Sequence, residues 1–324
     1  MSLRRPEDRI PTSVLRALEA LAQSPINTSA LAMAEAQGCN HDTLYRALDY
    51  PLPYFFSLCL PLCRTLGGPK GGYLLIDDVL IPRYRSGQLG LQRLRSPKDG
   101  AYPYGFSLVA LAWIDARGRR RVPLAFLPYF ADGEESKLDL ALSLLEWARE
   151  EGFEPEGVLF DAWYAAKEVL EWLHAQGWSF VTRLRANRLL EGIQLRRHGG
   201  AYWVKVGHLK GLSFAVQVVR RGRRFYASSG VDSEGKRTVE VYRLRQGIEE
   251  IFRGLQQELG WRGHRHWRRA KVLGHLALGL VAYGLIECQR ERLKSSFYQC
   301  RRRLITGKLS LDLSPLWAEQ TKAA

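Results

Sequence analysis

The sequence contains few cysteines, and their spacing does not match a disulfide or zinc framework. There are five among 324 residues, and none forms a Cys-X-X-Cys pair. Cys59 and Cys63 stand four residues apart in an apolar segment, where buried thiols are favoured over a metal site. A disulfide scaffold is therefore not expected, and a reducing cytoplasm suits the chain better.

The chain also lacks a clear signal for secretion or for a membrane. Its first residues, Met-Ser-Leu-Arg-Arg-Pro, contain no apolar signal core. The longest apolar stretch, residues 272–288, includes His275 and Glu287 and is short for a membrane span. We therefore predict a buried helix there, in a protein that acts inside the cell. No internal repeat or low-complexity segment occurs.

Acidic residues are scarce relative to basic ones. The chain has 48 Lys and Arg against 33 Asp and Glu, a net charge of +15 and a pI near 9.8. Such a balance predicts a polyanionic partner, most often nucleic acid, although a generally soluble surface is the alternative. At this length the chain forms a full core, with one main domain and smaller parts.

Several of the acids that are present interrupt or end apolar runs. Residues 73–76 lead into Asp77 and Asp78, after which the run resumes, and residues 157–160 lead into Asp161. These runs are typical of strands buried on both faces. A carboxylate in such a place is costly unless it is paired or binds a metal ion. The alternative for each acid is a salt bridge with one of the many arginines.

Residues 242–259 predict an amphipathic helix with an unusual polar side. At about 100° per residue, four polar side chains fall within roughly 60° of one another, beside an apolar stripe. These four are Tyr242, Arg245, Glu249 and Gln256. A phenol, a guanidinium, a carboxylate and an amide in one row suit a phosphate backbone held beside a metal-binding acid.

The spacing of Tyr242, Arg245 and Glu249 resembles the signature helix of the insertion sequence 4 family of DDE transposases. The family pattern ends in Lys, so Gln256 departs from it. Gln256 can donate a hydrogen bond but carries no charge. Arg253 is a possible substitute cation, although it points elsewhere on the helix.

The same family carries an aspartate after each of two upstream strands. Asp161 resembles the second. The usual pattern at the first is Asp-X-Thr, which favours Asp77 over Asp78 and puts Val79 where Thr is expected. The resemblance extends over roughly residues 70–290.

The resemblance implies an α/β fold, with an RNase H-like mixed sheet flanked by helices. It also implies a β-rich insertion between the second and third acids, and an N-terminal helical domain. The expected parts are an N-terminal helical DNA-binding domain at 1–66, the first part of the catalytic core at 70–187, the insertion at 188–240, the last part of the core at 241–290 and a C-terminal helical tail at 291–324.

The resemblance further implies a catalytic role for Asp77, Asp161 and Glu249, which would bind two Mg²⁺ ions, or Mn²⁺ in their place. The expected activity is cut-and-paste transposition, in which a transposase cleaves double-stranded DNA at transposon ends and joins it to a target. Synapsis of two ends implies a homodimer, and such a protein would be prokaryotic and nucleoid-associated. Two alternatives remain: a DNA-binding protein that has lost catalysis, and an RNase H-like nuclease without strand transfer.

Further residues are expected to contact DNA. Tyr242 and Arg245 would hold phosphates beside the scissile bond. Residues 27–48 resemble a helix-turn-helix, with Gly38 at the turn and Asp42 capping the second helix. In this interpretation Thr43, Tyr45 and Arg46 face a DNA groove, and a plain helical hairpin is the alternative.

Two more segments carry candidate contacts. Residues 261–271 interleave aromatic rings with basic side chains, including Arg265 and Arg268, as a phosphate-binding surface would. His264 and His266 suggest a metal, but no third ligand is near them in the sequence. Trp203, in the insertion, either stacks on an extruded base or packs in the core.

Overall fold

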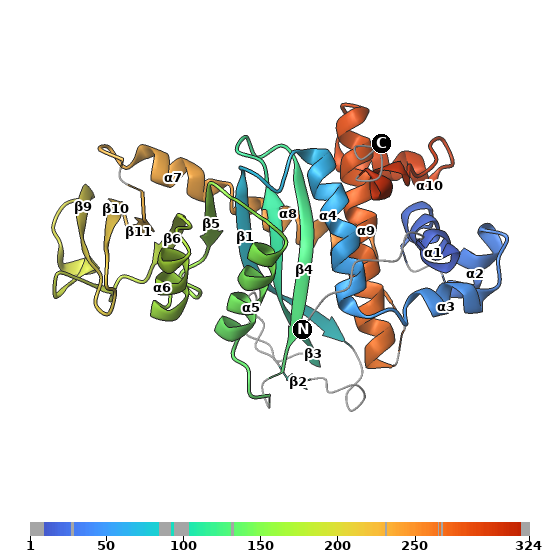
Figure 1. The fold of residues 1–324 in the computed structure, drawn as a ribbon, viewed down its shortest axis with the longest axis horizontal. Coiled ribbons are helices and arrows are strands. Elements are labelled where there is room, and N and C mark those ends of the chain that lie inside the picture. The colour runs from blue at the N-terminus through green and yellow to red at the C-terminus, as the bar shows by residue number, and fades with distance from the viewer. Residues whose placement is uncertain are drawn as a thin grey trace.

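The computed structural model describes residues 10–26, 29–83, 92–93, 104–130, 133–230, 232–264, 266 and 268–318. A long mixed sheet runs through the middle of the molecule. One end of it carries the strands of the insertion, and the other is covered by the N-terminal helices and the late helices (Figure 1).

The described helices lie on both sides of this sheet and at one end of it. They are α1 (Thr12–Gln23), α2 (Ala30–Ala36), α3 (His41–Ala47), α4 (Leu52–Leu66), α5 (Lys137–Glu150), α6 (Lys167–Ala175), α7 (Lys236–Arg243), α8 (Gln246–Glu258), α9 (Arg269–Arg292) and α10 (Phe297–Ile305). The strands are β1 (Tyr73–Arg83), β2 (Gln92–Arg93), β3 (Tyr104–Ile114), β4 (Arg121–Tyr129), β5 (Gly157–Phe160), β6 (Phe180–Leu184), β7 (Leu189–Leu190), β8 (Ile193–Gln194), β9 (Tyr202–His208), β10 (Ala215–Arg221) and β11 (Arg224–Ser228).

The core of the sheet is mixed, as predicted. β4, β3 and β1 are antiparallel neighbours, and β5 and β6 continue the sheet parallel to β1. The insertion does not stand apart from this core, because β11 pairs antiparallel with β6 and is followed by β10 and β9. The β-rich segment therefore extends the core sheet from its β6 edge.

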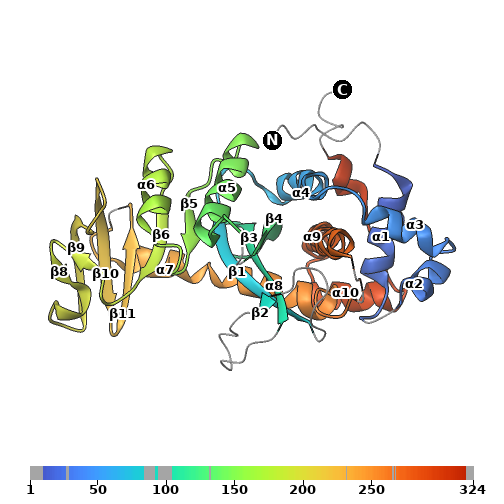
Figure 2. The ribbon, with the colours of Figure 1, turned by 90° about the horizontal axis from the view of Figure 1, so that it is seen from below.

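Helices cover the two faces of the sheet separately. α5 and α6 lie on one face, while α7 and α8 run along the other (Figure 2). Because neighbouring residues of a strand point to opposite faces, adjacent side chains of β1 reach different helices. This alternation decides which acids of β1 lie near α8.

The predicted buried helix at residues 272–288 is α9. It is long and apolar enough to cross a membrane, but 89% of its most apolar window is buried inside the fold. α4, β4, α1 and α10 pack around it. Gly274 of α9 lies so close to Leu48 that an added Cβ would stand 2.2 Å from the carbonyl oxygen of Leu48.

The N-terminal helices form a compact group. Ser29 caps α2 by accepting a hydrogen bond from the Ala32 amide, and Gly38 takes a positive φ of 60° in the following turn, as predicted. The cap of α3 is Asn40, not Asp42, because the Asn40 side chain accepts from the backbone amide of Asp42.

Arg301 of α10 ties this group to the rest of the protein. Arg301 is 1% exposed, and its guanidinium donates to the carbonyl oxygens of Ala22 in the last turn of α1, of Ser24 just after α1 and of Glu258 at the end of α8. Carbonyls at helix C-termini carry partial negative charge, so they stabilise a buried cation. Burial lowers the pKa of Arg301 to about 10.

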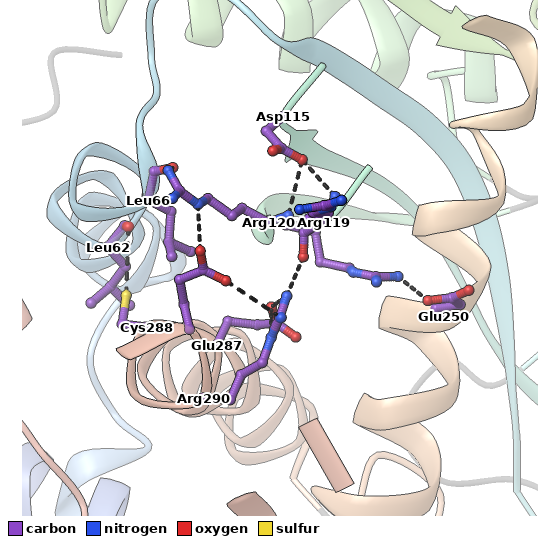
Figure 3. A network of polar contacts seen from close by, with 11 residues as sticks. Leu62, Leu66, Asp115, Arg119, Arg120, Glu250, Glu287, Cys288 and Arg290 are labelled. Atoms are coloured by element: carbon purple, nitrogen blue, oxygen red, sulfur yellow. Dashed lines mark hydrogen bonds and ion pairs between the residues drawn. The ribbon is translucent and has the colours of Figure 1, made fainter. Parts of the chain in front are cut away.

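A second polar network fixes the β3–β4 turn against α8 and α9 (Figure 3). Arg290 pairs with the buried Glu287 at 2.7 Å and also donates to the Arg119 carbonyl. Arg121, at the start of β4, pairs with Glu250 of α8. These contacts join the β3–β4 turn to α9 and the start of β4 to α8.

The cysteines follow the prediction. All five are free, and Cys39 is half-buried, while the other four are buried. Burial raises the pKa of the Cys288 thiol to about 12, so this sulfur remains protonated.

Candidate active site

The predicted helix at residues 242–259 is broken near its start. α7 ends at Arg243 and α8 begins at Gln246, with Leu244 and Arg245 between them in helical conformation. Hydrogen bonds from the Arg245 and Ile248 amides reach back three residues, so this turn is tighter than an α-helix. The break moves Tyr242 relative to Glu249, and a sequence periodicity could not show it.

The register of the sheet brings two of the acids together. Leu75 of β1 pairs with Leu159 of the parallel strand β5. Asp77 and Asp161 each follow two residues later, and therefore lie at equivalent positions on neighbouring strands. Asp161 comes directly after β5, as predicted, and its Oδ1 accepts the Trp163 amide at 2.8 Å.

Arg245 links the third acid to this pair. Its Nη1 lies 2.6 Å from Asp77 Oδ2, and its Nη2 lies 2.7 Å from Glu249 Oε1. The Arg245 and Asp77 side chains are 16% and 17% exposed, whereas Glu249 is 49% exposed. The Tyr242 ring centre lies 6.0 Å from the same guanidinium.

The neighbouring Asp78 faces the other side of the sheet. Its Oδ2 pairs with Lys137 of α5 at 2.5 Å, and its Oδ1 accepts a 3.4 Å hydrogen bond from the Tyr164 hydroxyl. Asp77 thus shares a face with α8, while Asp78 is engaged on the opposite face. This geometry supports the preference for Asp77.

The Asp77 carboxyl has a strongly shifted pKa. Burial raises the pKa of Asp77 to about 7, with Asp161 and Asp78 adding to the rise and Arg245 opposing it. A buried carboxyl with a pKa shifted this far marks a candidate functional site.

We expect Asp77→Asn to stabilise the protein at high pH. The folded protein holds the Asp77 proton up to about pH 7, whereas the unfolded chain releases it near its ordinary value of 3.8. The stability of the wild type therefore falls between these values as pH rises, and the variant lacks this loss. Its Tm in EDTA should exceed that of the wild type by about 2–4 °C or more at pH 8, and by less at pH 5. Equal Tm differences at both pH values would contradict the assignment.

The donor set fits a hard divalent cation. The candidate ligands on β1, after β5 and on α8 are all carboxylates, and Mg²⁺ prefers oxygen ligands of this kind. In their present arrangement, however, the described residues contain no group of three His, Cys, Asp or Glu side chains placed to hold a metal ion. Arg245 stands between Asp77 and Glu249 instead.

A basic pocket of about 490 Å³ opens beside these acids. Its floor includes Tyr226 and Tyr242, whose rings meet edge to face at 5.2 Å. Glu249 is the acid that lines it. The arginines around it are Arg183, Arg221, Arg223, Arg224, Arg243 and Arg245.

Sequence reasoning missed most of these arginines. Arg221 and Arg224 end β10 and begin β11, far from the signature helix in the chain, and only the pairing of β11 with β6 brings them to it. The dense Arg221–Arg224 run was the available signal. Trp163, two residues after Asp161, was also missed; it is 54% exposed and lies 5.5 Å from the Arg185 guanidinium.

The other predicted DNA contacts that the structure describes do not line this pocket. Trp203, on β9, is half-buried and packs against Phe225 and His198. This packing favours its core interpretation. On α8, Arg253 is exposed and Gln256 is half-buried.

The DNA contacts predicted near the N-terminal helices differ in how exposed they are. Arg46 is exposed, but Tyr45 packs edge to face on His266, and its carbonyl accepts from Lys271. Tyr45 is therefore turned towards the body of the protein. Arg268 is exposed at the start of α9, and Arg265 lies outside the described residues.

In the fold, His264 and His266 lie beside a third imidazole. His275 of α9 joins them, with ring centres 4.9 and 5.1 Å away. The distance in sequence hid this contact. Even so, the part of the chain that the structure describes contains no metal-binding group of three such side chains.

The strand order and the helices on both faces define the class of fold: an RNase H-like mixed sheet. The chain covers 99% of its length, and 76% of the other chain, in a superposition on a cryo-EM structure of the piggyBac transposase synaptic complex with hairpin DNA. The TM-score is 0.56 and the sequence identity 13%, so this likeness concerns the fold.

The family described as "Transposase DDE domain" matches residues 72–285, about two thirds of the chain. The protein therefore belongs to the DDE transposase domain family. No curated protein matches it.

Proposed function

We propose that this protein is a metal-dependent transposase that cleaves double-stranded DNA at transposon ends and joins the freed ends to a target. The observation that carries the proposal is that Asp77 of β1 and Glu249 of α8 meet at one guanidinium, while Asp161, after β5, lies close enough to Asp77 to raise its pKa. Family membership supports the transposase class.

The three carboxylates would hold two Mg²⁺ ions, or Mn²⁺ in their place. When bound there, the ions would supply Lewis-acid activation of the attacking hydroxyl and stabilise the leaving oxygen. Asp77 and Asp161 would contribute ligands from adjacent strands, and Glu249 would contribute one from α8. Arg245 and Tyr242 would orient the phosphate next to the scissile bond.

The basic pocket supports DNA as the partner. Five of its arginines, other than Arg245, form no salt bridge with a described acid. Such clustered positive charge repels itself, so a polyanion that enters the pocket is bound favourably. The exposed Arg46, Arg253 and Arg268 would contact the backbone further away, as would Arg265. Gln256 and Trp203 remain candidate contacts of lower weight.

We expect Arg223→Gln/Arg224→Gln to weaken DNA binding in a salt-dependent way. Losing two phosphate contacts should lower the slope of log Kd against log salt by about 2, and weaken affinity at low salt by on the order of tenfold. Fluorescence anisotropy with a labelled duplex measures both. The matched control is Arg196→Gln/Arg197→Gln, an exposed pair on the same insertion outside the pocket. Equal losses in both variants would remove the pocket from the DNA path.

The proposal is tested with the DNA that flanks the gene. If this DNA contains short inverted repeats, the wild type should nick it at their tips with Mg²⁺ or Mn²⁺, and should join the ends to a second duplex. Nicking without joining would favour a nuclease, and binding without nicking would favour a protein that has lost catalysis. Two ends held in one complex would indicate a homodimer. Such an enzyme would act in the cytoplasm of a prokaryote, on its nucleoid.

A further inference from the structure

The guanidinium of Arg245 occupies the space that links the candidate metal ligands. One of its terminal nitrogens contacts Asp77 and the other contacts Glu249, at 2.6 and 2.7 Å. Divalent cations bind through the same carboxylate oxygens. Arg245 and a metal ion therefore compete for Asp77 Oδ2 and Glu249 Oε1.

The pairing is firm on the Asp77 side. Both side chains are mostly buried, so water screens their attraction weakly. Burial lowers the pKa of Arg245, but Asp77, Tyr242 and Glu249 together outweigh this effect and the pKa is raised overall. An arginine always carries its charge, so loss of a proton cannot release the acids. Movement of the Arg245 side chain would release both acids together.

The neighbouring pocket offers a reason for the side chain to move. Arg245 lines both the acid cluster and the basic pocket, where Arg183 and Arg243 also converge. A phosphate bound there accepts hydrogen bonds from a guanidinium in the same two-pronged way as a carboxylate. A phosphate contact of this kind uses the nitrogens that now hold Asp77 and Glu249.

We propose that Arg245 keeps the acids closed to metal until DNA arrives, so that DNA and divalent metal bind cooperatively. This inference rests on the proposed function, because it concerns the same three carboxylates. It assigns Arg245 two successive sets of partners: the acids in the free protein and a DNA phosphate in the complex. Even where Mg²⁺ is abundant, the enzyme would then bind the metal at these acids only after it binds DNA.

The test measures Mn²⁺ affinity by electron paramagnetic resonance of free Mn²⁺, with full-length protein and no cleavage readout. Without DNA, Arg245→Gln should bind Mn²⁺ at least about fivefold more tightly than the wild type. Arg243→Gln is the matched control, since it removes the same charge from the same pocket, and Arg243 forms no salt bridge with a described acid. Its affinity should stay within about twofold of the wild type.

A second arm adds a duplex of arbitrary sequence, with the Mn²⁺ bound by DNA alone subtracted. The duplex should tighten Mn²⁺ binding to the wild type by about fivefold or more and leave Arg245→Gln unchanged. By linkage, Mn²⁺ should tighten DNA binding by the same factor. Arg245→Lys provides a folded variant if the Gln variant melts early. Its single ammonium cannot bridge both acids, so its affinity should lie between the other two.

The Asp77→Asn variant distinguishes failure of the proposed function from failure of the gating role of Arg245. If this variant binds Mn²⁺ like the wild type in every arm, the metal lies elsewhere and the proposed function is wrong at this site. If it loses Mn²⁺ but Arg245→Gln matches the wild type or Arg243→Gln, the acids bind metal and the gating role of Arg245 is overturned. An absent duplex effect on the wild type overturns it as well.

Discussion

Glu249→Gln should reduce metal-dependent DNA cleavage by about 10³-fold or more. The amide keeps the shape of the side chain but removes the negative charge that Mg²⁺ requires. Loss of one ligand of a two-ion centre removes several kcal/mol of stabilisation from the transition state, and each 1.36 kcal/mol is about a factor of ten in rate. The rate of nicking of a substrate with the element's ends, at saturating protein, measures this loss.

The adjacent Glu250 provides the control. It lies on the same helix and carries the same group, but it pairs with Arg121 of β4 and not with the acid cluster. Glu250→Gln should cleave within about threefold of the wild type, as surface substitutions away from a site have small effects. Both variants should bind DNA with similar affinity. If Glu249→Gln cuts as well as Glu250→Gln, the catalytic assignment of Glu249 is wrong.

Arg301→Met should destabilise the protein more than any nearby surface change. The variant leaves the carbonyls of Ala22, Ser24 and Glu258 buried without the donor that now satisfies them. Stranding several buried acceptors costs about 3 kcal/mol or more, because each loses the hydrogen bonds it would make in water. In a chain of this length, a change of this size lowers Tm by roughly 4–5 °C or more.

The neighbouring Arg302 serves as the comparison. It lies on the same helix but is exposed, so Arg302→Met should stay within about 0.5 kcal/mol of the wild type. Differential scanning calorimetry of both variants gives the difference. Equal melting temperatures would show that Arg301 does not hold the N-terminal helices to α8 and α10.

The acids and the central strands were predictable because their signals are local. An apolar run that ends in a carboxylate identifies β5 and Asp161 without any knowledge of their neighbours. The mixed core sheet followed from the resemblance and was confirmed. The choice between Asp77 and Asp78 required the family pattern, and the structure supports it through the alternation of faces along β1.

Contacts between distant segments were not predictable. Nothing in residues 260–271 shows that His275 lies beside His264, or that Arg301 reaches the end of α1. The arginines of the basic pocket meet Tyr242 only because the insertion extends the core sheet at β6. The tight turn at Leu244 was hidden as well, since both halves keep helical periodicity on either side of it.

The arginines of the basic pocket bear on the interpretation of Gln256, which departs from the family pattern. The cation that the family pattern places there is missing, but the insertion contributes Arg221, Arg223 and Arg224 to the pocket beside Glu249. Positive charge for a DNA strand is therefore present near the acids from another part of the chain. This supply weakens the case that Gln256 marks a protein without activity.

We propose that Asp77, Asp161 and Glu249 share a divalent metal centre when DNA is bound. The most direct measurement is anomalous scattering from Mn²⁺ in crystals of the protein–DNA complex. We expect peaks about 2.0–2.2 Å from oxygens of all three carboxylates, with Arg245 turned towards a phosphate. Strong Mn²⁺ peaks elsewhere, with none at these acids and Arg245 still bridging Asp77 and Glu249, would contradict it.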